Sequence, residues 1–208
     1  MSTASTSDSP PPPAIRTPDE AIDALMQGNR RFIENAAVPH DHPAARERTT
    51  TGQSPFAAVI RCADSRVAPE IVFDRTIGEL FVCGVAGNLP TPEIIASLEY
   101  SVGILKSPLV VVMGHSGCGA VHAAIEHEDD VTALPGGLPD LVTHILPATA
   151  ASRGAEDRLS TAIEINVRNG VRRILDDSPL ISEAVDAGRC KVVGGVYDLA
   201  SGRFTLVE

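Results

Sequence analysis

Short apolar runs and longer amphipathic stretches alternate along most of this chain. Four of the runs are continuous enough to be buried strands, and they occupy residues 56–60, 80–83, 108–113 and 191–197. Residues 204–207 can add an edge strand. Because continuous apolar strands separated by helices are typical of parallel sheets covered on both faces, the pattern predicts an α/β fold, with a mostly parallel central sheet flanked by helices.

The clearest helix start lies at residues 17–20, where a threonine, a proline and a glutamate three residues after the threonine make a capping box. The apolar face of this helix fades near Asn35. The same cap-plus-proline pattern at residues 91–93 predicts a helix that runs through Leu105. A further helix is expected at residues 120–127, directly after the third predicted strand.

Polar segments separate or interrupt these elements. Residues 36–54 predict an extended connection, with His40 and His42 on a solvated loop. Residues 141–187 predict two or three helices with a break at Ser178, because proline follows it. Residues 1–14 are rich in Ser, Thr and Pro and predict a disordered tail. A single domain over residues 15–208 is expected, since one core suits this length.

Composition excludes several classes of partner. The net charge is −10 and no block of Lys and Arg is long enough to follow phosphates, which argues against nucleic acids and anionic membranes. Aromatic residues make up only 3% of the chain, too few for a base-stacking surface. No apolar run reaches the roughly 18 residues of a membrane span. The N-terminus lacks the pattern of a secretory or transit signal, so a cytoplasmic location is expected by default.

Two polar motifs follow two of the predicted strands. Cys62-Ala63-Asp64-Ser65-Arg66 comes after the first strand, and His115-Ser116-Gly117-Cys118 after the third. The carboxyl ends of strands are where open α/β sheets bind ligands. Two cysteines and one histidine are ligands that zinc prefers, and catalytic zinc sites with this set are known. A helix starting near Cys118 would lower the pKa of its thiol and favour the metal-binding thiolate.

Asp64 has two possible partners, and the residues alone leave both open. If Asp64 binds the zinc, four ligands fill the site and no water can be activated. If Arg66 holds Asp64 in a charge-assisted pair, the site opens to a water whose pKa zinc lowers to about 7. The other two cysteines, Cys83 and Cys190, lie in or beside predicted strands without a partner motif, which favours core packing.

The CxDxR and HxxC motifs, about fifty residues apart, resemble those of the β-class carbonic anhydrases, and the similarity extends from about Thr17 to the end of the chain. The resemblance implies one zinc ion per chain with Cys62, His115 and Cys118 as ligands. Asp64 would be the fourth ligand or, paired with Arg66, the gate for a zinc-bound hydroxide. That hydroxide would hydrate CO2 reversibly to bicarbonate and a proton.

The resemblance further implies that Gln53 lies by the substrate pocket and that the chain forms homodimers or multiples of dimers. One departure stands out: Gly84-Val85 occupies the place where many members carry Arg followed by Asn or Val. Two rival functions stay open, a non-catalytic zinc-binding paralogue and a hydrolase of a CO2-like molecule such as carbon disulfide or carbonyl sulfide. Gly84 favours the first rival, whereas the intact Asp64 and Arg66 speak against it.

Overall fold

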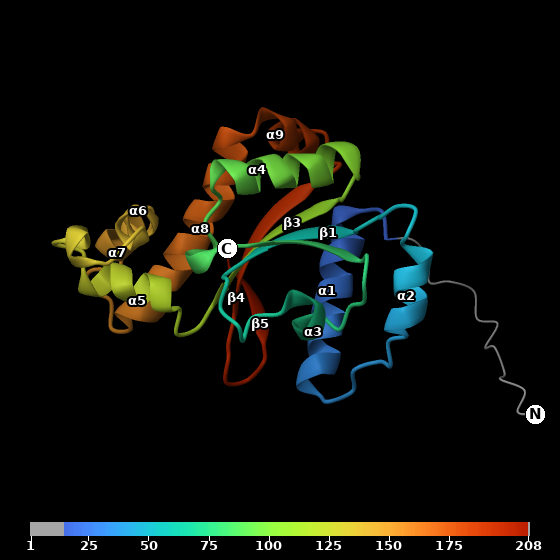
Figure 1. The fold of residues 1–208 in the computed structure, drawn as a ribbon, viewed down its shortest axis with the longest axis horizontal. Coiled ribbons are helices and arrows are strands. Elements are labelled where there is room, and N and C mark those ends of the chain that lie inside the picture. Colours follow the sequence, from blue (N-terminus) through green and yellow to red (C-terminus); the bar gives the residue numbers. More distant parts are fainter. Residues whose placement is uncertain (1–14, 208) are drawn as a thin grey trace, which may run out of the picture.

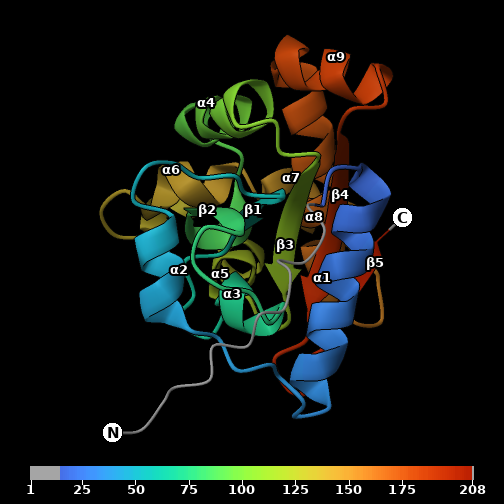
Figure 2. The ribbon, with the colours of Figure 1, turned by 90° about the vertical axis from the view of Figure 1, so that its right-hand side faces the viewer.

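Five strands form one sheet in the order β2-β1-β3-β4-β5, seen in the computed structural model of Figures 1 and 2, which describes residues 15–207. Strands β1 to β4 are parallel, and β5 pairs with β4 in the antiparallel direction. The strands are β1 Ala57–Arg61, β2 Leu80–Gly84, β3 Leu109–His115, β4 Lys191–Tyr197 and β5 Phe204–Val207. The predicted α/β class and mostly parallel sheet are therefore confirmed.

Helices cover both faces of the sheet. The α-helices are α1 Pro18–Ile33, α2 His42–Arg48, α3 Pro69–Val72, α4 Pro92–Glu99, α5 Gly119–Glu126, α6 Leu138–Thr143, α7 Leu146–Ala151, α8 Arg158–Asp177 and α9 Pro179–Asp186. Three shorter helical turns are η1 Ala86–Asn88, η2 Tyr100–Ile104 and η3 Val131–Ala133. None of the helices described is both long enough and apolar enough to cross a membrane.

Side-chain alternation along the strands divides the core into two layers. Val59 and Val111 point to one face, where they pack with α1 and α3. Ile60 and Val112 point to the other face, against α4, α8 and α9. Figure 1 shows the sheet between these two groups of helices. All seven residues of β3 are buried, as its continuous apolar run predicts.

A third apolar cluster lies beyond the carboxyl ends of β1 and β3. It joins Cys62 and Cys118 to α5, α6 and the first part of α8, with Val121, Ile145 and Ile163 among its members. Figure 1 shows α5, α6 and α7 grouped at this end of the molecule. Aliphatic side chains therefore pack against one side of the two cysteines.

Most helix boundaries agree with the sequence, and one segment predicted to be extended does not. The capping box at Thr17 and Glu20 is present, and Ser178 caps α9 where the break was expected. Residues 36–54 are not wholly extended, because α2 forms within them. Asp41 caps α2 by accepting from the amide of Ala44. The helix predicted to run from residue 92 through Leu105 is α-helical to Glu99 and continues as the π-helical turn η2 to Ile104, with Leu105 as its C-cap.

The predicted tail at residues 1–14 lies outside the described residues. The single domain expected over residues 15–208 stays a prediction.

Candidate metal centre

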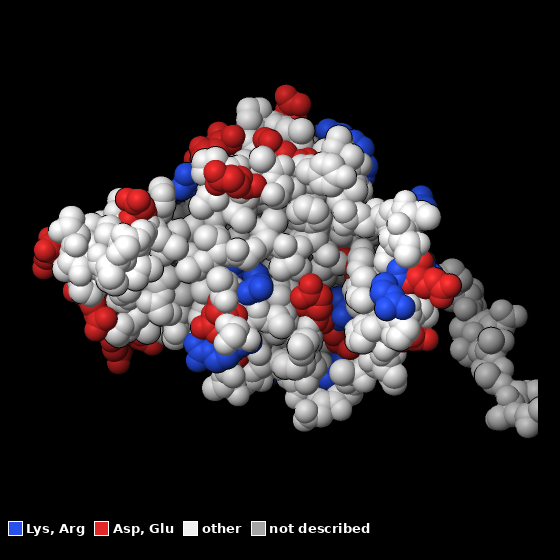
Figure 3. Space-filling model, viewed as in Figure 1, with Lys and Arg blue, Asp and Glu red and all other residues white. Residues whose placement is uncertain are grey.

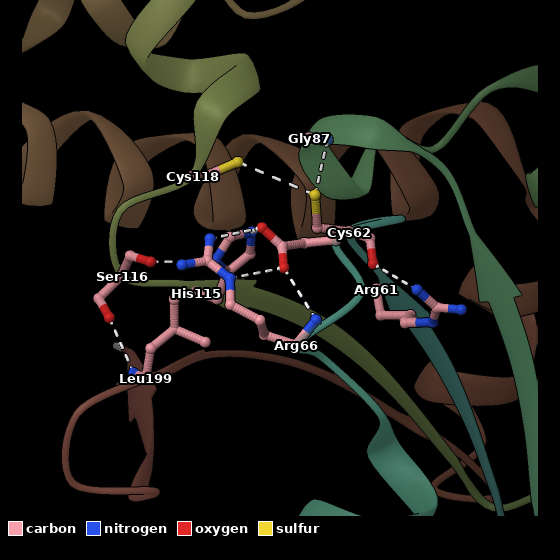
Figure 4. A network of polar contacts seen from close by, with 9 residues as sticks. Arg61, Cys62, Arg66, Gly87, His115, Ser116, Cys118 and Leu199 are labelled. Carbon is pink, nitrogen blue, oxygen red and sulfur yellow. Dashed lines mark hydrogen bonds and ion pairs between the residues drawn. The ribbon is translucent and has the colours of Figure 1, made fainter.

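The two sequence motifs meet at one edge of the sheet. β1 and β3 are parallel neighbours, so Cys62, directly after β1, lies close to His115, the last residue of β3. Cys118 follows three residues later as the N-cap of α5. The turn between them contains Gly117, whose φ of 63° is in the left-handed region that favours glycine. Figure 4 shows the three side chains converging.

The three potential ligand atoms form a compact, buried triangle. Both sulfurs and a ring nitrogen of His115 lie within 4.8 Å of one another, and the Cys62 and Cys118 sulfurs are 4.0 Å apart. Two thiolates on a tetrahedral zinc, each at about 2.3 Å from the metal, would be about 3.8 Å apart. The observed separation therefore fits zinc. None of the three residues is more than 5% exposed.

The ring of His115 is oriented by the chain around it. Its Nδ1 donates to the carbonyl of Ser116 at 3.0 Å, which leaves Nε2 as the nitrogen with the free lone pair. Ser116 is itself fixed, because its amide donates to Tyr197 and its hydroxyl oxygen accepts from Leu199. Nε2 is buried without a hydrogen-bond partner among the described residues. A buried ring nitrogen facing two thiols is what a metal ligand requires.

Arg66 holds Asp64 beside this triangle with a forked contact. Arg66 Nε donates to Oδ1 at 2.9 Å, and Nη2 donates to Oδ2 at 2.7 Å. The Arg66 amide adds a third bond to Oδ1 at 2.9 Å. Asp64 Oδ2 is 3.9 Å from His115 Nε2. The hydrogen bonds from Arg66 hold the pKa of the Asp64 carboxyl well below its usual range, so the carboxylate is ionised at neutral pH.

The pKa values of the two thiols shift in opposite directions. The hydrogen bond from Cys118 lowers the pKa of Cys62 to about 4, with help from His115 and from the Asp64 and Gly87 amides. The same contact with Cys62 raises the pKa of Cys118, and burial adds to the rise. The prediction that α5 lowers the pKa of Cys118 concerns the contribution of the helix alone, and that contribution has the expected sign. The first amides of α5 do lower it, but the neighbouring Cys62 thiolate outweighs them.

Other candidate residues lie elsewhere. Gln53 is exposed and lies four residues before β1, whereas Cys62 directly follows β1, so the whole strand lies between them along the chain. Cys83 and Cys190 are buried in the core behind α4 and α8, as expected. His40 is not simply solvated, because its Nε2 lies 2.9 Å from Oδ1 of the buried Asp74.

Two hydrogen bonds to Cys62 are not apparent from the sequence. Arg61, the last residue of β1, donates from Nη1 to the carbonyl of Cys62 at 2.8 Å (Figure 4). The backbone amide of Gly87 donates to the Cys62 sulfur at 3.4 Å. A backbone amide leaves no residue-type signal in the sequence. The one hint of a donor to Cys62 is the glycine at position 87, shortly after the end of β2.

Comparison with known proteins gives the same family from three directions. A family model described as carbonic anhydrase matches residues 57–204. Carbonic anhydrase 2 of Mycobacterium tuberculosis H37Rv is 40% identical over 197 residues, which cover 91% of this chain and 92% of that protein. A carbonic anhydrase of Pseudomonas aeruginosa is 37% identical over 200 residues, covering 88% and 86%.

Solved structures agree with the sequence comparisons. The Coccomyxa β-carbonic anhydrase in complex with acetazolamide superposes with a TM-score of 0.69 at 26% identity, covering 89% of this chain and 86% of that one. The residues matched by the family model include both motifs and strands β1 to β4. The chain therefore belongs to the β-carbonic anhydrase family and is an enzyme of the lyase class.

Proposed function

We propose that this chain hydrates CO2 to bicarbonate and a proton at one zinc ion held by Cys62 Sγ, His115 Nε2 and Cys118 Sγ. The observation that carries the proposal is the buried triangle of the two sulfurs and a ring nitrogen of His115, all within 4.8 Å of one another. Zinc bound there would supply a Lewis acid and lower the pKa of a coordinated water to about 7. Family membership and the geometry of the sulfurs both support this assignment.

Asp64 and Arg66 act in the proposal as a gate on the fourth position. Both carboxylate oxygens of Asp64 are bound by Arg66, so the carboxylate is held beside the triangle and not within it. Two thiolates already balance the charge of Zn²⁺, and a third anion there would be favoured less than a neutral water. Asp64 in this place is an ionised acceptor that can orient a hydroxyl group of water or of bicarbonate.

Gln53 enters the proposal as a residue that one chain offers to the site of another. Within one chain, β1 separates it from Cys62, yet its exposed position leaves it available to a neighbouring copy. We infer a homodimer, or a multiple of dimers, in which the β2 side of the sheet is covered. β2 is an edge strand, and Ile71 and Ile77 in the segment before it are 63% and 46% exposed. The cytoplasmic location expected from the sequence stays a prediction.

The function is tested by stopped-flow CO2 hydration on protein whose zinc content has been measured. We expect turnover with one zinc per chain, loss of turnover when a chelator removes the metal, and recovery when zinc is added back. Equal turnover by metal-free protein would rule out the zinc mechanism. A fully zinc-loaded protein without turnover would instead favour the non-catalytic paralogue.

The gate is tested separately with Asp64→Asn. This change keeps the size of the side chain but removes the charge that Arg66 binds and one of its two acceptor oxygens. We expect it to retain zinc and to lose about 10- to 100-fold in kcat, as changes beside a metal site commonly do. Asp177→Asn is the matched control, because Asp177 pairs with Arg173 on α8, remote from the triangle. Full activity in Asp64→Asn would remove Asp64 from the mechanism.

A further inference from the structure

The sulfur of Cys62 accepts a hydrogen bond from the backbone amide of Gly87, at 3.4 Å (Figure 4). Gly87 lies in η1, just after β2, and its φ of 72° is in the left-handed region. A Cβ on this residue would lie 2.9 Å from Cδ1 of Ile145. Backbone conformation and space therefore both favour glycine here, and the amide can face the sulfur only while this conformation is held.

The other end of the same residue is held by a side chain from α8. Nδ2 of Asn166 donates to the carbonyl oxygen of Gly87 at 2.9 Å. Asn166 is only 5% exposed, although it belongs to a helix whose other buried residues are mainly apolar. A buried amide side chain is costly unless it is hydrogen-bonded. Gly87 thus donates a hydrogen bond to Cys62 through its amide and accepts one from Asn166 through its carbonyl.

We propose that Asn166 is a positioning residue for the Cys62 thiolate, acting through Gly87. By fixing the carbonyl of Gly87, Asn166 fixes the direction of the Gly87 amide, which then donates to the sulfur. The inference rests on the proposed role of Cys62 as a zinc ligand. It assigns a function to a side chain that is 79 positions from Gly87 and does not touch the metal ligands itself.

A hydrogen bond on a thiolate changes how that thiolate binds a metal. The donor draws electron density from the sulfur, which lowers the energy of the sulfur lone pairs and makes the sulfur a weaker electron donor to the metal. Outer partners of this kind orient the ligand and tune the metal. When the Gly87 amide loses its direction, the sulfur donates more strongly but is less well placed, and metal affinity falls.

The test compares cobalt- and zinc-loaded proteins that carry Asn166→Leu with the unaltered chain. Leucine keeps nearly the same shape and removes the donor to Gly87. With Co²⁺ in place of zinc, the sulfur-to-metal charge-transfer band should move to longer wavelength, because the sulfur lone pairs rise in energy. In chelator competition, zinc binding should weaken about tenfold, at the lower end of what loss of an outer-shell partner costs.

Asn29→Leu is the matched control. Asn29 is 3% exposed on α1, and its Nδ2 also donates to backbone carbonyls, those of Val72 and Gly202. Its loss should lower the melting temperature while leaving the cobalt band and the zinc affinity unchanged. If Asn166→Leu does not fold, Asn166→Ser serves as the second variant. The serine side chain is too short to reach Gly87, and it is too small to overpack the core.

The results separate this inference from the function on which it rests. An unaltered chain that shows no sulfur-to-cobalt band would refute Cys62 as a ligand, and with it the proposed function. An unaltered chain with the band, and Asn166 variants whose band and zinc affinity match those of Asn29→Leu, would refute only the role of Asn166. Its contribution would then be general stability.

Discussion

Arg61 occupies the space beside Gly84. The two residues are register partners on β1 and β2, and a Cβ built on Gly84 would lie 3.4 Å from Cζ of Arg61. The missing side chain at position 84 thus leaves room for a guanidinium from the neighbouring strand. That guanidinium donates to the carbonyl of Cys62, so the glycine at position 84 is linked to the support of a proposed zinc ligand.

Restoring an arginine at position 84 should therefore be unfavourable while Arg61 is present. Like charges directly opposite in a sheet cost roughly 0.2–1 kcal/mol, so Gly84→Arg should lower the melting temperature by at most about 4 °C. Arg61→Ala should cost less in the Gly84→Arg background than in the unaltered chain, because the new side chain can use the vacated space. Thermal unfolding of both single variants and the double variant measures this coupling. Strictly additive losses would show that the two positions do not share that space.

The cluster proposed as the metal site could be predicted from sequence, whereas the residues that support it could not. Cys62, His115 and Cys118 belong to short motifs placed directly after buried strands, and parallel strands bring such ends together. Asn166 has no motif, and its partner is a backbone carbonyl 79 positions away. Contacts of that kind depend on how α8 packs across the sheet, which periodicity does not specify.

Among the elements, residues 36–54 differ most from the sequence prediction, because α2 forms in a segment predicted to be extended. Its polar composition hides a local start signal, the Asp41 cap followed by proline in the first turn. The same segment is tied to the turn after α3 by one carboxylate. Asp74, 4% exposed, accepts from Arg31, from the amide of Val38 and from His40.

The pH dependence of this contact has a definite sign. Burial alone would raise the pKa of Asp74, but hydrogen bonds from Arg31, Val38 and His40 outweigh it and lower the pKa. A carboxyl whose pKa is lower in the folded than in the unfolded chain stabilises the fold above the unfolded value of about 3.9. That stabilisation is lost as the pH falls through the lower folded value.

Asp74→Asn should therefore reduce the free energy of unfolding by about 1–3 kcal/mol at pH 7, the cost of losing a buried, charged hydrogen-bond acceptor. The difference from the unaltered chain should begin to shrink as the pH falls below about 3.9, because the carboxyl is then protonated in the unfolded chain, and it should vanish only below the lower folded pKa, where the native carboxyl is protonated too. Urea unfolding at a series of pH values measures both quantities. A difference that stays constant down to pH 3 would contradict the assigned role of the charge.

At the scale of the whole molecule, charges are scattered and apolar residues mark one edge. On the face shown in Figure 3, basic side chains lie among acidic ones and form no broad field. Ile71 and Ile77 are exposed in the segment that leads to the edge strand β2. An edge strand with apolar neighbours is a surface that natural proteins usually cover.

Ile71→Asp should shift the chain toward monomer if a second copy covers this edge. Placing a charge in an apolar interface costs desolvation energy without a partner. Light scattering should report the lower mass, and CO2 hydration should fall with it, because Gln53 of the second copy would leave the site. Leu138→Asp on α6, where Leu138 is 43% exposed, is the control and should change neither. A variant that keeps its mass would place the interface elsewhere.

The overall architecture could be predicted well because each buried strand is a continuous apolar run with turn residues after it. The sheet order could not, because runs such as residues 80–83 and 191–197 look alike in sequence although β2 lies at an edge and β4 is internal. The third apolar cluster, at α5, α6 and the first part of α8, could not be predicted from the sequence either. It forms beyond the strand ends, where no periodic pattern links its members.

Zinc K-edge X-ray absorption on protein loaded with one zinc per chain tests the proposed metal site directly. Coordination by Cys62, His115 and Cys118 predicts two sulfurs at about 2.3 Å and an imidazole nitrogen at about 2.0–2.1 Å, with one further light atom. Cys62→Ser and Cys118→Ser should each reduce the sulfur count to one or abolish binding. A zinc shell with no sulfur, or one unchanged in both variants, would contradict the assignment of Cys62 and Cys118 as zinc ligands.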